Sequence, residues 1–217
     1  MATRSLHDKP FSLACEENQA PIFAVVAPLF AKARQVLEIG SGTGQHAVYF
    51  ANRLPHLIWQ TSDVPAQLPG IRLWLAEARL PNLPEPLSLD VTGDWPAGPF
   101  DGVFSANTAH IMGLPEVGRM FLGVGQILAA GTSFALYGPF SDGGRQTSES
   151  NARFDASLKA RDPRMGVRDL DDLRALAARA GLELRADHPM PVNNRTLVWC
   201  RCDSAGSRTH PATRPEV

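Results

Sequence analysis

The stretch Val36-Leu-Glu-Ile-Gly-Ser-Gly-Thr-Gly-Gln45 gives the strongest indication of the fold. An apolar segment ends in glycines at every second position, Gly40, Gly42 and Gly44, and a helical pattern begins directly after them. Glycine adopts backbone conformations that other residues avoid, and it lets a ligand lie directly against the backbone. The stretch therefore predicts a strand, a tight turn and a helix, with a small molecule bound above the turn. A glycine-rich turn that binds no ligand is the simplest alternative.

Strand-like and helix-like segments alternate through most of the chain on either side of this turn. Such alternation is typical of a parallel sheet that is covered by helices on both faces. The last two strand-like segments have no room for a crossover helix between them, so we expect them to pair antiparallel. The predicted fold is α/β, a doubly wound, mostly parallel sheet of seven strands that ends in a C-terminal antiparallel hairpin. The predicted strands are Gln35–Ile39, Leu57–Asp63, Pro86–Asp90, Phe100–Asn107, Thr132–Tyr137, Leu182–Ala186 and Thr196–Arg201, and the predicted helices are Ala20–Ala33, Gln45–Arg53, Ala66–Arg79, Glu116–Leu128 and Leu170–Ala180.

The length of 217 residues indicates one domain. We expect a flexible N-terminal arm over residues 1–15, a single domain over 16–202 and a disordered tail over 203–217, because the tail has no apolar periodicity. Pro21 is expected in the first turn of the first predicted helix, where proline is well tolerated, and Pro28 is expected to kink that helix. The oligomeric state does not follow from the sequence.

The composition excludes several classes of function. Hydrophobic residues make up 44% and charged residues 20% of the chain, which is usual for a folded globular protein. The formal net charge is -1 and no basic stripe is present, so nucleic acid is not the expected partner. No segment reaches the length of an apolar membrane span, and charged residues interrupt the first 30 residues. We therefore expect a cytoplasmic protein without a membrane partner.

The three cysteines, Cys15, Cys200 and Cys202, have neither the spacing of a zinc site nor that of a disulfide framework. The sequence predicts no metal site.

Acidic and amide side chains follow the ends of the predicted strands. Glu38 lies two residues before Gly40, and Asp63, Asp90 and Asn107 end the next three strands. Because the carboxyl ends of parallel strands meet at one edge of a sheet, we expect these groups to line one crevice. The glycine spacing differs from the G-x-G-x-x-G pattern of dinucleotide sites, and Glu38 is unfavourable beside a phosphate, which argues against an NAD(P)-dependent oxidoreductase. Capping of a turn or helix is the alternative role for Asp63 and Asp90.

The glycine stretch resembles motif I of the class I methyltransferases that use S-adenosylmethionine, a ligand with a positively charged sulfur and no phosphate. The resemblance implies that the methionine part of the cofactor lies over the glycine loop, and that Asp90 and the backbone amide of Val91 bind the adenine. Asp63 stands where a carboxylate can accept both hydroxyls of a ribose. His46 is placed either to touch the cofactor carboxylate or to cap the local backbone. The expected cofactor-binding residues are Glu38, Gly40, Ser41, Gly42, Thr43, Gly44, His46, Asp63, Asp90, Val91 and Asn107.

Outside the glycine loop, the chain resembles a narrower family, domain of unknown function 938, also called the methyltransferase-like protein 26 group, over about residues 12–201. This resemblance implies a class I methyltransferase fold with an S-adenosylmethionine site, and it implies no particular substrate. It rests on the blocks Ala14-Cys-Glu-Glu-Asn18 before Pro21-Ile22, Gly40-Ser-Gly-Thr-Gly-Gln-His-Ala47, Asn107-Thr-Ala-His-Ile111, Tyr137-Gly-Pro139, Thr147-Ser-Glu-Ser-Asn151 with Phe154-Asp155, Gly166-Val-Arg-Asp-Leu170 and Met190-Pro-Val-Asn-Asn194.

Methyl transfer from a sulfonium is an in-line displacement, so the protein has mainly to align the two reactants and exclude water. A general base is needed only if the acceptor loses a proton, and His110 is the candidate because it titrates near neutrality; a structural histidine is the alternative. The stretch Thr147–Ala160 is expected to cover the pocket, with Phe154 in the core. The candidate catalytic residues are His110 and Asn107, and the candidate substrate-binding residues are Asn18, Tyr137, Asn151, Asn193 and Asn194, of which Asn193 and Asn194 alternatively form only a turn.

The sequence as a whole predicts an S-adenosylmethionine-dependent methyltransferase with a small-molecule acceptor. A protein that keeps the methyltransferase fold and binds ligands or partners without catalysis is the alternative from another functional class. The acceptor atom and the use of a base do not follow from the sequence.

Overall fold

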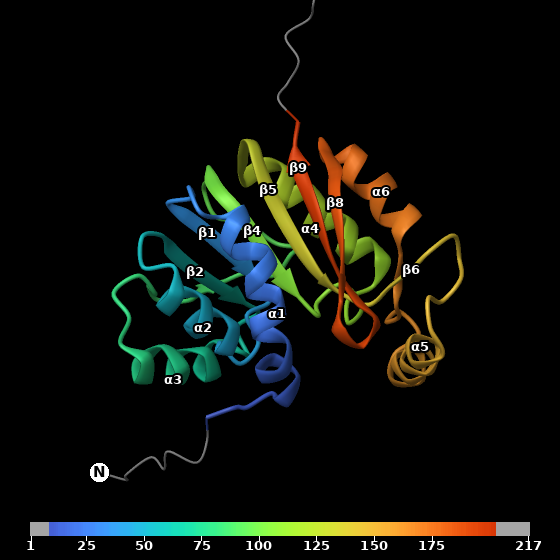
Figure 1. Cartoon of the computed structure of the whole chain (residues 1–217), viewed down its shortest axis with the longest axis horizontal. Helices are drawn as coiled ribbons and strands as arrows, with labels where there is room; N and C mark the ends of the chain where they lie inside the picture. The colour runs from blue at the N-terminus through green and yellow to red at the C-terminus, as the bar shows by residue number, and fades with distance from the viewer. Residues whose placement is uncertain (1–8, 203–217) are drawn as a thin grey trace, which may run out of the picture.

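The computed structural model describes residues 9–202. Its centre is a seven-stranded sheet with the order β3-β2-β1-β4-β5-β9-β8, and β6 and β7 form a separate two-stranded sheet (Figure 1). The strands β1 to β5 are parallel, whereas β9 is antiparallel to both β5 and β8. The predicted fold class is confirmed. The strands are β1 Gln35–Ile39, β2 Ile58–Asp63, β3 Leu87–Ser88, β4 Phe100–Ala106, β5 Leu128–Gly138, β6 Phe140–Ser141, β7 Arg168–Asp169, β8 Leu182–Met190 and β9 Asn194–Arg201.

Helices cover both faces of the large sheet. In Figure 1, α1 crosses in front of the sheet with α2 and α3 beside it, and α4 lies behind the sheet with α6 to its right. Helix α5 stands apart from these two layers, next to the turn between β8 and β9 (Figure 1). The helices of residues 9–202 are α1 Leu13–Leu29, α2 Gln45–Arg53, α3 Leu68–Ala78, α4 Leu114–Ile127, α5 Glu149–Arg161 and α6 Leu170–Arg179, and a 3-10 turn, η2, lies at Pro191–Asn193.

The two faces of β1 supply two hydrophobic cores. Val36 packs with Phe50 and Trp59 on the side of α1 and α2, whereas Leu37 packs with Phe121 and other residues on the side of α4. Burial on both faces explains why the strand has a nearly continuous apolar sequence. Since side chains alternate along a strand, the side chain after Leu37 points to the same side as Val36, into the core beneath the glycine loop.

The N-terminal part of the domain differs from the prediction. Helix α1 begins at Leu13, and its first turn is capped by Ser12, whose side chain accepts a hydrogen bond from the backbone of Cys15. Pro21 therefore lies inside the helix instead of in its first turn. The carbonyl of Pro10 accepts a hydrogen bond of 2.7 Å from Trp74 Nε1, so this part of the expected flexible arm contacts α3. The remaining parts of the predicted arm and tail, residues 1–8 and 203–217, lie outside the described residues.

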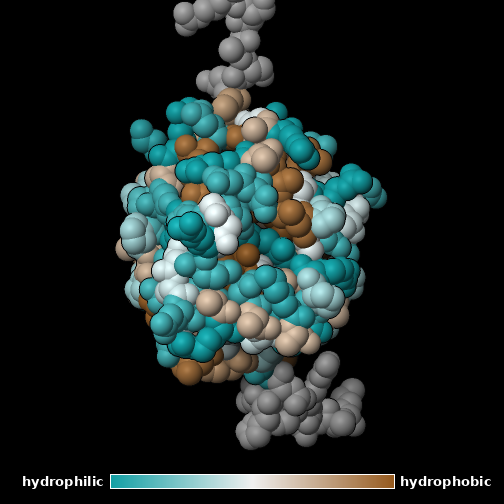
Figure 2. All heavy atoms as spheres, turned by 90° about the vertical axis from the view of Figure 1, so that its right-hand side faces the viewer, coloured by the Kyte–Doolittle hydropathy of each residue, from teal (hydrophilic) through white to brown (hydrophobic). Residues whose placement is uncertain are grey.

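Several predicted strands have different lengths. Strand β3 has only two residues, and β5 begins directly after α4 and runs for eleven. Strand β8 continues to Met190, which pairs with Asn194, because the η2 turn connects the two strands within three residues. Among residues 9–202, no helix combines the length and the apolar character needed to cross a membrane. The side that carries α5 and α6 is covered mainly by hydrophilic residues, with smaller apolar areas between them (Figure 2).

Candidate functional site

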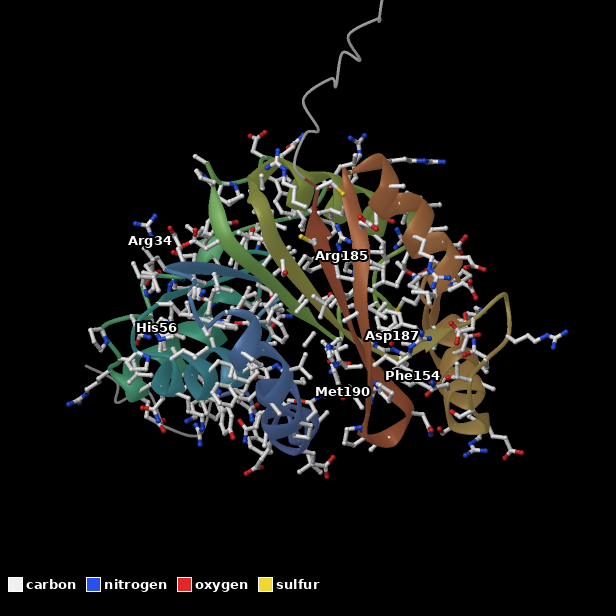
Figure 3. The ribbon with its side chains drawn as sticks, turned by 45° about the horizontal axis from the view of Figure 1, so that its top comes forward. Arg34, His56, Phe154, Arg185, Asp187 and Met190 are labelled. Carbon is white, nitrogen blue, oxygen red and sulfur yellow. The ribbon has the colours of Figure 1, made fainter. Side chains whose placement is uncertain are left out.

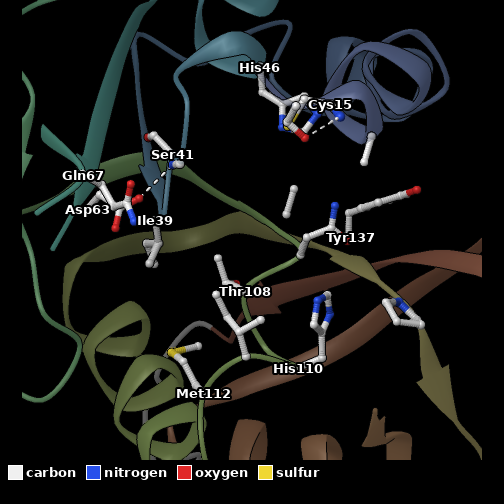
Figure 4. Close-up of a pocket in the computed structure, with 18 of the residues that line it drawn as sticks. Cys15, Ile39, Ser41, His46, Asp63, Gln67, Thr108, His110, Met112 and Tyr137 are labelled. Atoms are coloured by element: carbon white, nitrogen blue, oxygen red, sulfur yellow. Dashed lines mark hydrogen bonds between the residues drawn. The ribbon is translucent and has the colours of Figure 1, made fainter. Parts of the chain in front are cut away.

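A cavity of about 930 Å³ lies at the carboxyl ends of the central strands. It is located where the strand order reverses between β1 and β4, which is the position at which open α/β sheets bind ligands. Figure 4 shows Asp63 and Gln67 at one end of the cavity and His110 with Tyr137 at the other. Of the sequence-predicted site residues, those that line the cavity are Asn18, Gly40, Ser41, Gly42, Thr43, His46, Asp63, Asp90, Val91, Asn107, His110, Tyr137, Asn151 and Asn194. Glu38, Gly44 and Asn193 do not line it.

The glycine loop adopts the backbone conformations that its sequence predicts. Gly40, Gly42 and Gly44 have φ angles of 69°, 57° and 91°, in the left-handed region that favours glycine. A Cβ atom at Gly40 would lie 2.4 Å from Cγ2 of Thr108, so the loop and the segment after β4 approach too closely for any side chain there. A Cβ at Gly42 would meet no atom within 4 Å, so this glycine leaves the surface of the loop open.

Glu38 supports the loop from below and does not reach the cavity. Its side chain is 1% exposed, and its Oε2 accepts hydrogen bonds from Trp59 Nε1 at 3.0 Å and Ser41 Oγ at 3.1 Å. Burial raises the pKa of this carboxyl to about 7. The position of Glu38 therefore does not support the predicted direct contact with a cofactor, because the alternation along β1 turns the side chain toward the core.

Asp63 fixes the glycine loop and also faces the cavity. Its two carboxylate oxygens accept backbone hydrogen bonds of 2.7 Å from Gly42 and from Val64, so it fixes the glycine loop. Burial raises the pKa of this carboxyl, while the two backbone donors act in the opposite direction. Each carboxylate oxygen can accept a second hydrogen bond, and the side chain faces the cavity. Asp63 is therefore available to ligand hydroxyls.

Asp90 lies at the exposed rim of the cavity. Its Oδ1 accepts hydrogen bonds from the backbone of Thr92 at 2.9 Å and from Thr92 Oγ1 at 2.7 Å, and the backbone donor lowers the pKa of the carboxyl. These contacts form the predicted turn cap. Within residues 9–202, Oδ2 accepts no hydrogen bond, so one oxygen of Asp90 remains available at the rim beside Val91.

His46 is held in place by helix α1. Its Nε2 lies 2.7 Å from Oδ1 of Asn18, and its ring stacks on Phe50 with the ring centroids 5.5 Å apart. Burial lowers the pKa of His46 to about 4, so the imidazole is neutral at pH 7 and Nε2–H donates to Asn18. This contact is neither of the two roles predicted for His46, although its ring does line the cavity.

His110 faces the opposite end of the cavity from Asp63 (Figure 4). It is 7% exposed, and its ring packs edge-to-face on Phe154 with the centroids 5.1 Å apart. Burial, with a further contribution from Arg168, lowers its pKa to about 4. The ring therefore carries no charge at pH 7 and can accept a proton. Phe154 lines the cavity and is 38% exposed, so its predicted place in the core is wrong.

The turn between β8 and β9 is connected to the start of α5 by asparagines. Nδ2 of Asn151 donates to the backbone carbonyl of Asn193 at 3.0 Å, and Nδ2 of Asn193 donates to Ser150 Oγ at 3.0 Å. Val192 has a φ of 57° and Asn193 one of 58°, and the left-handed region is costly for a β-branched residue such as Val192. Asn193 thus holds the turn and leaves the cavity wall to Asn194 and Val192, which is 80% exposed.

A backbone hydrogen bond connects two further predicted site residues, Asn107 and Tyr137. Asn107 has a φ of 59°, and its N–H donates to the carbonyl of Tyr137 at 2.9 Å. This bond joins the ends of β4 and β5 below the cavity. Burial raises the pKa of the Tyr137 hydroxyl, so the phenol is protonated at pH 7 and can donate a hydrogen bond.

Sequence reasoning missed several lining residues. Cys15 and Ser12 were missed because α1 was predicted to begin too late. Thr108, Ile111 and Met112 belong to the same segment as His110, and only that histidine had a recognisable chemical role. Among the described residues, no group of three or more His, Cys, Asp or Glu side chains is arranged to hold a metal ion. The other missed residues are Ala14, Ile39, Val64, Gln67, Leu89, Ala106, Gly113, Glu116, Pro139, Ser150, Phe154, Asp162, Arg164 and Val192.

The sheet order, the left-handed glycine loop and the cavity above it together define the fold of the class I methyltransferases. The chain belongs to the family described as protein of unknown function (DUF938), whose match covers residues 9–201. The family relationship proposed from the sequence is thereby confirmed.

Solved structures of methyltransferases share this fold. An O-methyltransferase family protein from Burkholderia thailandensis has a TM-score of 0.77 and 18% identity, with coverage of 88% of this chain and 58% of that protein. Mitomycin 7-O-methyltransferase has a TM-score of 0.73 and 19% identity, with coverage of 91% and 59%. Human N-acetylserotonin methyltransferase, solved with S-adenosylmethionine, has a TM-score of 0.72 and 12% identity, with coverage of 88% and 53%. The chain thus spans less than two thirds of the length of these proteins, and the likeness shows the fold.

Proposed function

We propose that this protein is an S-adenosylmethionine-dependent methyltransferase that methylates a hydroxyl group of a small, largely apolar molecule. One observation carries the proposal: the open glycine loop with Asp63 and the neutral side chain of His110 face the same cavity from opposite ends. The cavity volume of about 930 Å³ is at the upper end of the range for small-molecule sites, which leaves room for a cofactor and an acceptor together.

The cofactor end of the cavity fits S-adenosylmethionine. Gly40 and Gly42 keep the loop surface free of side chains, and Asp63 and Asp90 have carboxylate oxygens for hydroxyl and amine donors. Both carboxylates also favour a ligand with a positive charge and disfavour a diphosphate. When bound, S-adenosylmethionine supplies a methyl group attached to a positively charged sulfur.

The acceptor end of the cavity combines a proton acceptor with apolar walls. His110 is neutral over the physiological range, so it can take the proton that a hydroxyl loses as its oxygen is methylated. Ile111, Met112, Phe154 and Val192 line the surrounding surface and favour an apolar acceptor. Structurally similar proteins include two that are described as O-methyltransferases, which supports an oxygen acceptor.

Binding calorimetry with S-adenosylhomocysteine tests the cofactor part of the proposal. We expect one molecule bound per chain, a higher melting temperature in its presence and neither effect with NADH. Absence of binding heat and of a melting shift with S-adenosylhomocysteine contradicts the proposal. A panel of hydroxylated aromatic and aliphatic molecules, incubated with methyl-labelled S-adenosylmethionine, then tests transfer. Binding without transfer to any member favours the non-catalytic alternative.

A further inference from the structure

The block Gly166-Val-Arg-Asp-Leu170 does not line the cavity, yet it contacts the segment that carries His110. This segment connects β4 to α4 and contains no strand or long helix, so its backbone groups lack regular partners. Buried backbone groups need hydrogen bonds from elsewhere. In this case, the donors come from residues more than fifty positions later in the chain.

Arg168 provides most of these donors. Its Nε donates to the carbonyl of Ala109 at 3.0 Å, and its Nη2 donates to the carbonyl of Met112 and to that of Arg164 at 2.7 Å. The backbone N–H of Gly166 donates to the carbonyl of His110 at 3.0 Å. The carbonyls of Ala109 and Met112 are therefore bound by Arg168, and the carbonyl of His110 between them is bound by Gly166. A guanidinium holds several acceptors at once because its donors form a rigid planar fork.

The backbone around Arg168 is itself fixed. Arg168 pairs with Phe140 in the small sheet of β6 and β7. On one side, the N–H of Val167 donates to Asp155 Oδ1 at 2.8 Å. On the other side, Asp169 caps α6 and accepts a hydrogen bond of 2.8 Å from Ser141 Oγ. The guanidinium therefore projects from a well-supported position toward the histidine segment.

The side chain of His110 depends on this support. Its ring has no hydrogen bond to another side chain within residues 9–202, and its only aromatic neighbour at the cavity is Phe154. The direction of the ring therefore depends on packing around this buried residue and on the backbone that carries it. A shift of this backbone would move the ring away from its place in the cavity wall.

We propose that Arg168 is a positioning residue that holds the backbone of residues 109–112, and thereby aims His110 into the acceptor end of the cavity. The role of His110 toward an acceptor rests on the proposed function, whereas the positioning by Arg168 is independent of it. The charge of Arg168 also disfavours protonation of His110. The carboxylates that interact with Arg168 come from three helices, Glu116 from α4, Asp155 from α5 and Asp172 from α6, and the cation Arg164 pairs with Glu116.

Two substitutions separate the hydrogen bonds of Arg168 from its charge. Arg168→Lys keeps the charge but cannot bind the carbonyls of Ala109, Met112 and Arg164 with a planar fork, whereas Arg168→Met removes both. Arg34→Met is the matched control, because its side chain is 92% exposed and Figure 3 places it on the side of the molecule away from Phe154. The measurements are the pKa of the His110 ring by NMR, assigned with His110→Gln, and the exchange rate of the Gly166 amide.

We expect both Arg168 variants to raise the pKa of His110 by about one unit or more toward the free value near 6.5, because the loosened ring becomes better solvated. The Gly166 amide should exchange at least tenfold faster in both variants and at the wild-type rate in Arg34→Met. Unchanged values in Arg168→Lys contradict the positioning role and leave only the effect of charge. Because the full-length protein is measured without cofactor, these results are independent of S-adenosylhomocysteine binding, whose absence contradicts only the proposed function.

Discussion

The two ends of the cavity are constructed in different ways. The cofactor end consists of strand ends and the turn that follows β1, so its residues are close in sequence to one another or stand at equivalent positions of successive strands. The acceptor end is assembled from α1, α5, the segment after β4 and the β8–β9 turn, and its geometry depends on contacts such as the one between Asn151 and the carbonyl of Asn193. The comparison indicates that the cofactor end follows from local sequence, whereas the acceptor end follows from tertiary packing.

Replacement of His110 should produce the largest effect and should be confined to the acceptor end. In His110→Gln, we expect methyl transfer to fall by about 10²- to 10⁴-fold, because a general base contributes that much to a proton-transfer step. The affinity for S-adenosylhomocysteine should stay within twofold of wild type. In the wild type, the rate should increase with pH through about 4, where the imidazole loses its proton, and stay constant up to pH 7. If His110→Gln lost affinity for S-adenosylhomocysteine by the same factor as it lost rate, the cofactor and acceptor ends of the cavity would not be functionally separate.

Replacement of Asp63 should affect the cofactor end alone. In Asp63→Ala, the lost hydrogen bonds to a charged acceptor correspond to about 1.5–3 kcal/mol, or roughly 10- to 100-fold weaker binding of S-adenosylhomocysteine. Asp94→Ala is the control, because Asp94 is exposed and does not line the cavity. Calorimetry measures both variants. Equal affinity of Asp63→Ala and wild type would mean that Asp63 only fixes the glycine loop.

A pair of glycine substitutions separates backbone strain from steric exclusion within the cofactor end. Gly42→Ala should lower the free energy of unfolding by about 1 kcal/mol through its left-handed backbone alone. Gly40→Ala should cost about 1–3 kcal/mol more, because its Cβ meets Cγ2 of Thr108. Thr108→Ser removes that methyl group, so the double variant Gly40→Ala/Thr108→Ser should regain most of the difference. Denaturant unfolding measures these values, and equal losses in both single variants would argue against the steric account.

The smallest effect is expected from the hydrogen bond between Asn151 of α5 and the β8–β9 turn. Asn151→Ala removes the hydrogen bond to Asn193, so the turn should hold the acceptor less well. We expect KM for the acceptor to rise by about two- to tenfold, equivalent to roughly 0.5–1.4 kcal/mol, with little change in kcat. Ser157→Ala, on an exposed part of α5, is the control. A loss of kcat without a change in KM would instead assign Asn151 to the reaction step.

The order of the elements and the glycine loop could be predicted because they depend on local patterns. The boundaries of β1 and α2 agree with the prediction, since the turn between them is defined by three glycines. The start of α1 could not be predicted, because its Ser12 cap is a common residue type and Pro21 suggested a later start. The partners of His110 also could not be predicted, since Arg168 and Phe154 come from distant parts of the chain.

The alternation of side chains along a strand could have corrected the prediction for Glu38. Glu38 follows Leu37 in a strand that is buried on both faces, so its side chain had to enter a core. The expected contact with a cationic ligand relied on motif position and ignored that geometry. Its side chain accepts hydrogen bonds from Trp59 and from Ser41 of the glycine loop. Glu38 therefore supports the loop from the core and does not contact the cavity.

A crystal structure of the protein with S-adenosylhomocysteine would locate the cofactor site. We expect density for the ligand against the backbone of the glycine loop, with its ribose hydroxyls bound by Asp63 and its sulfur directed toward the end of the cavity that contains His110. Ligand density elsewhere on the molecule would contradict this assignment. A cavity that stays empty after both soaking and co-crystallisation at saturating ligand concentration would also contradict it.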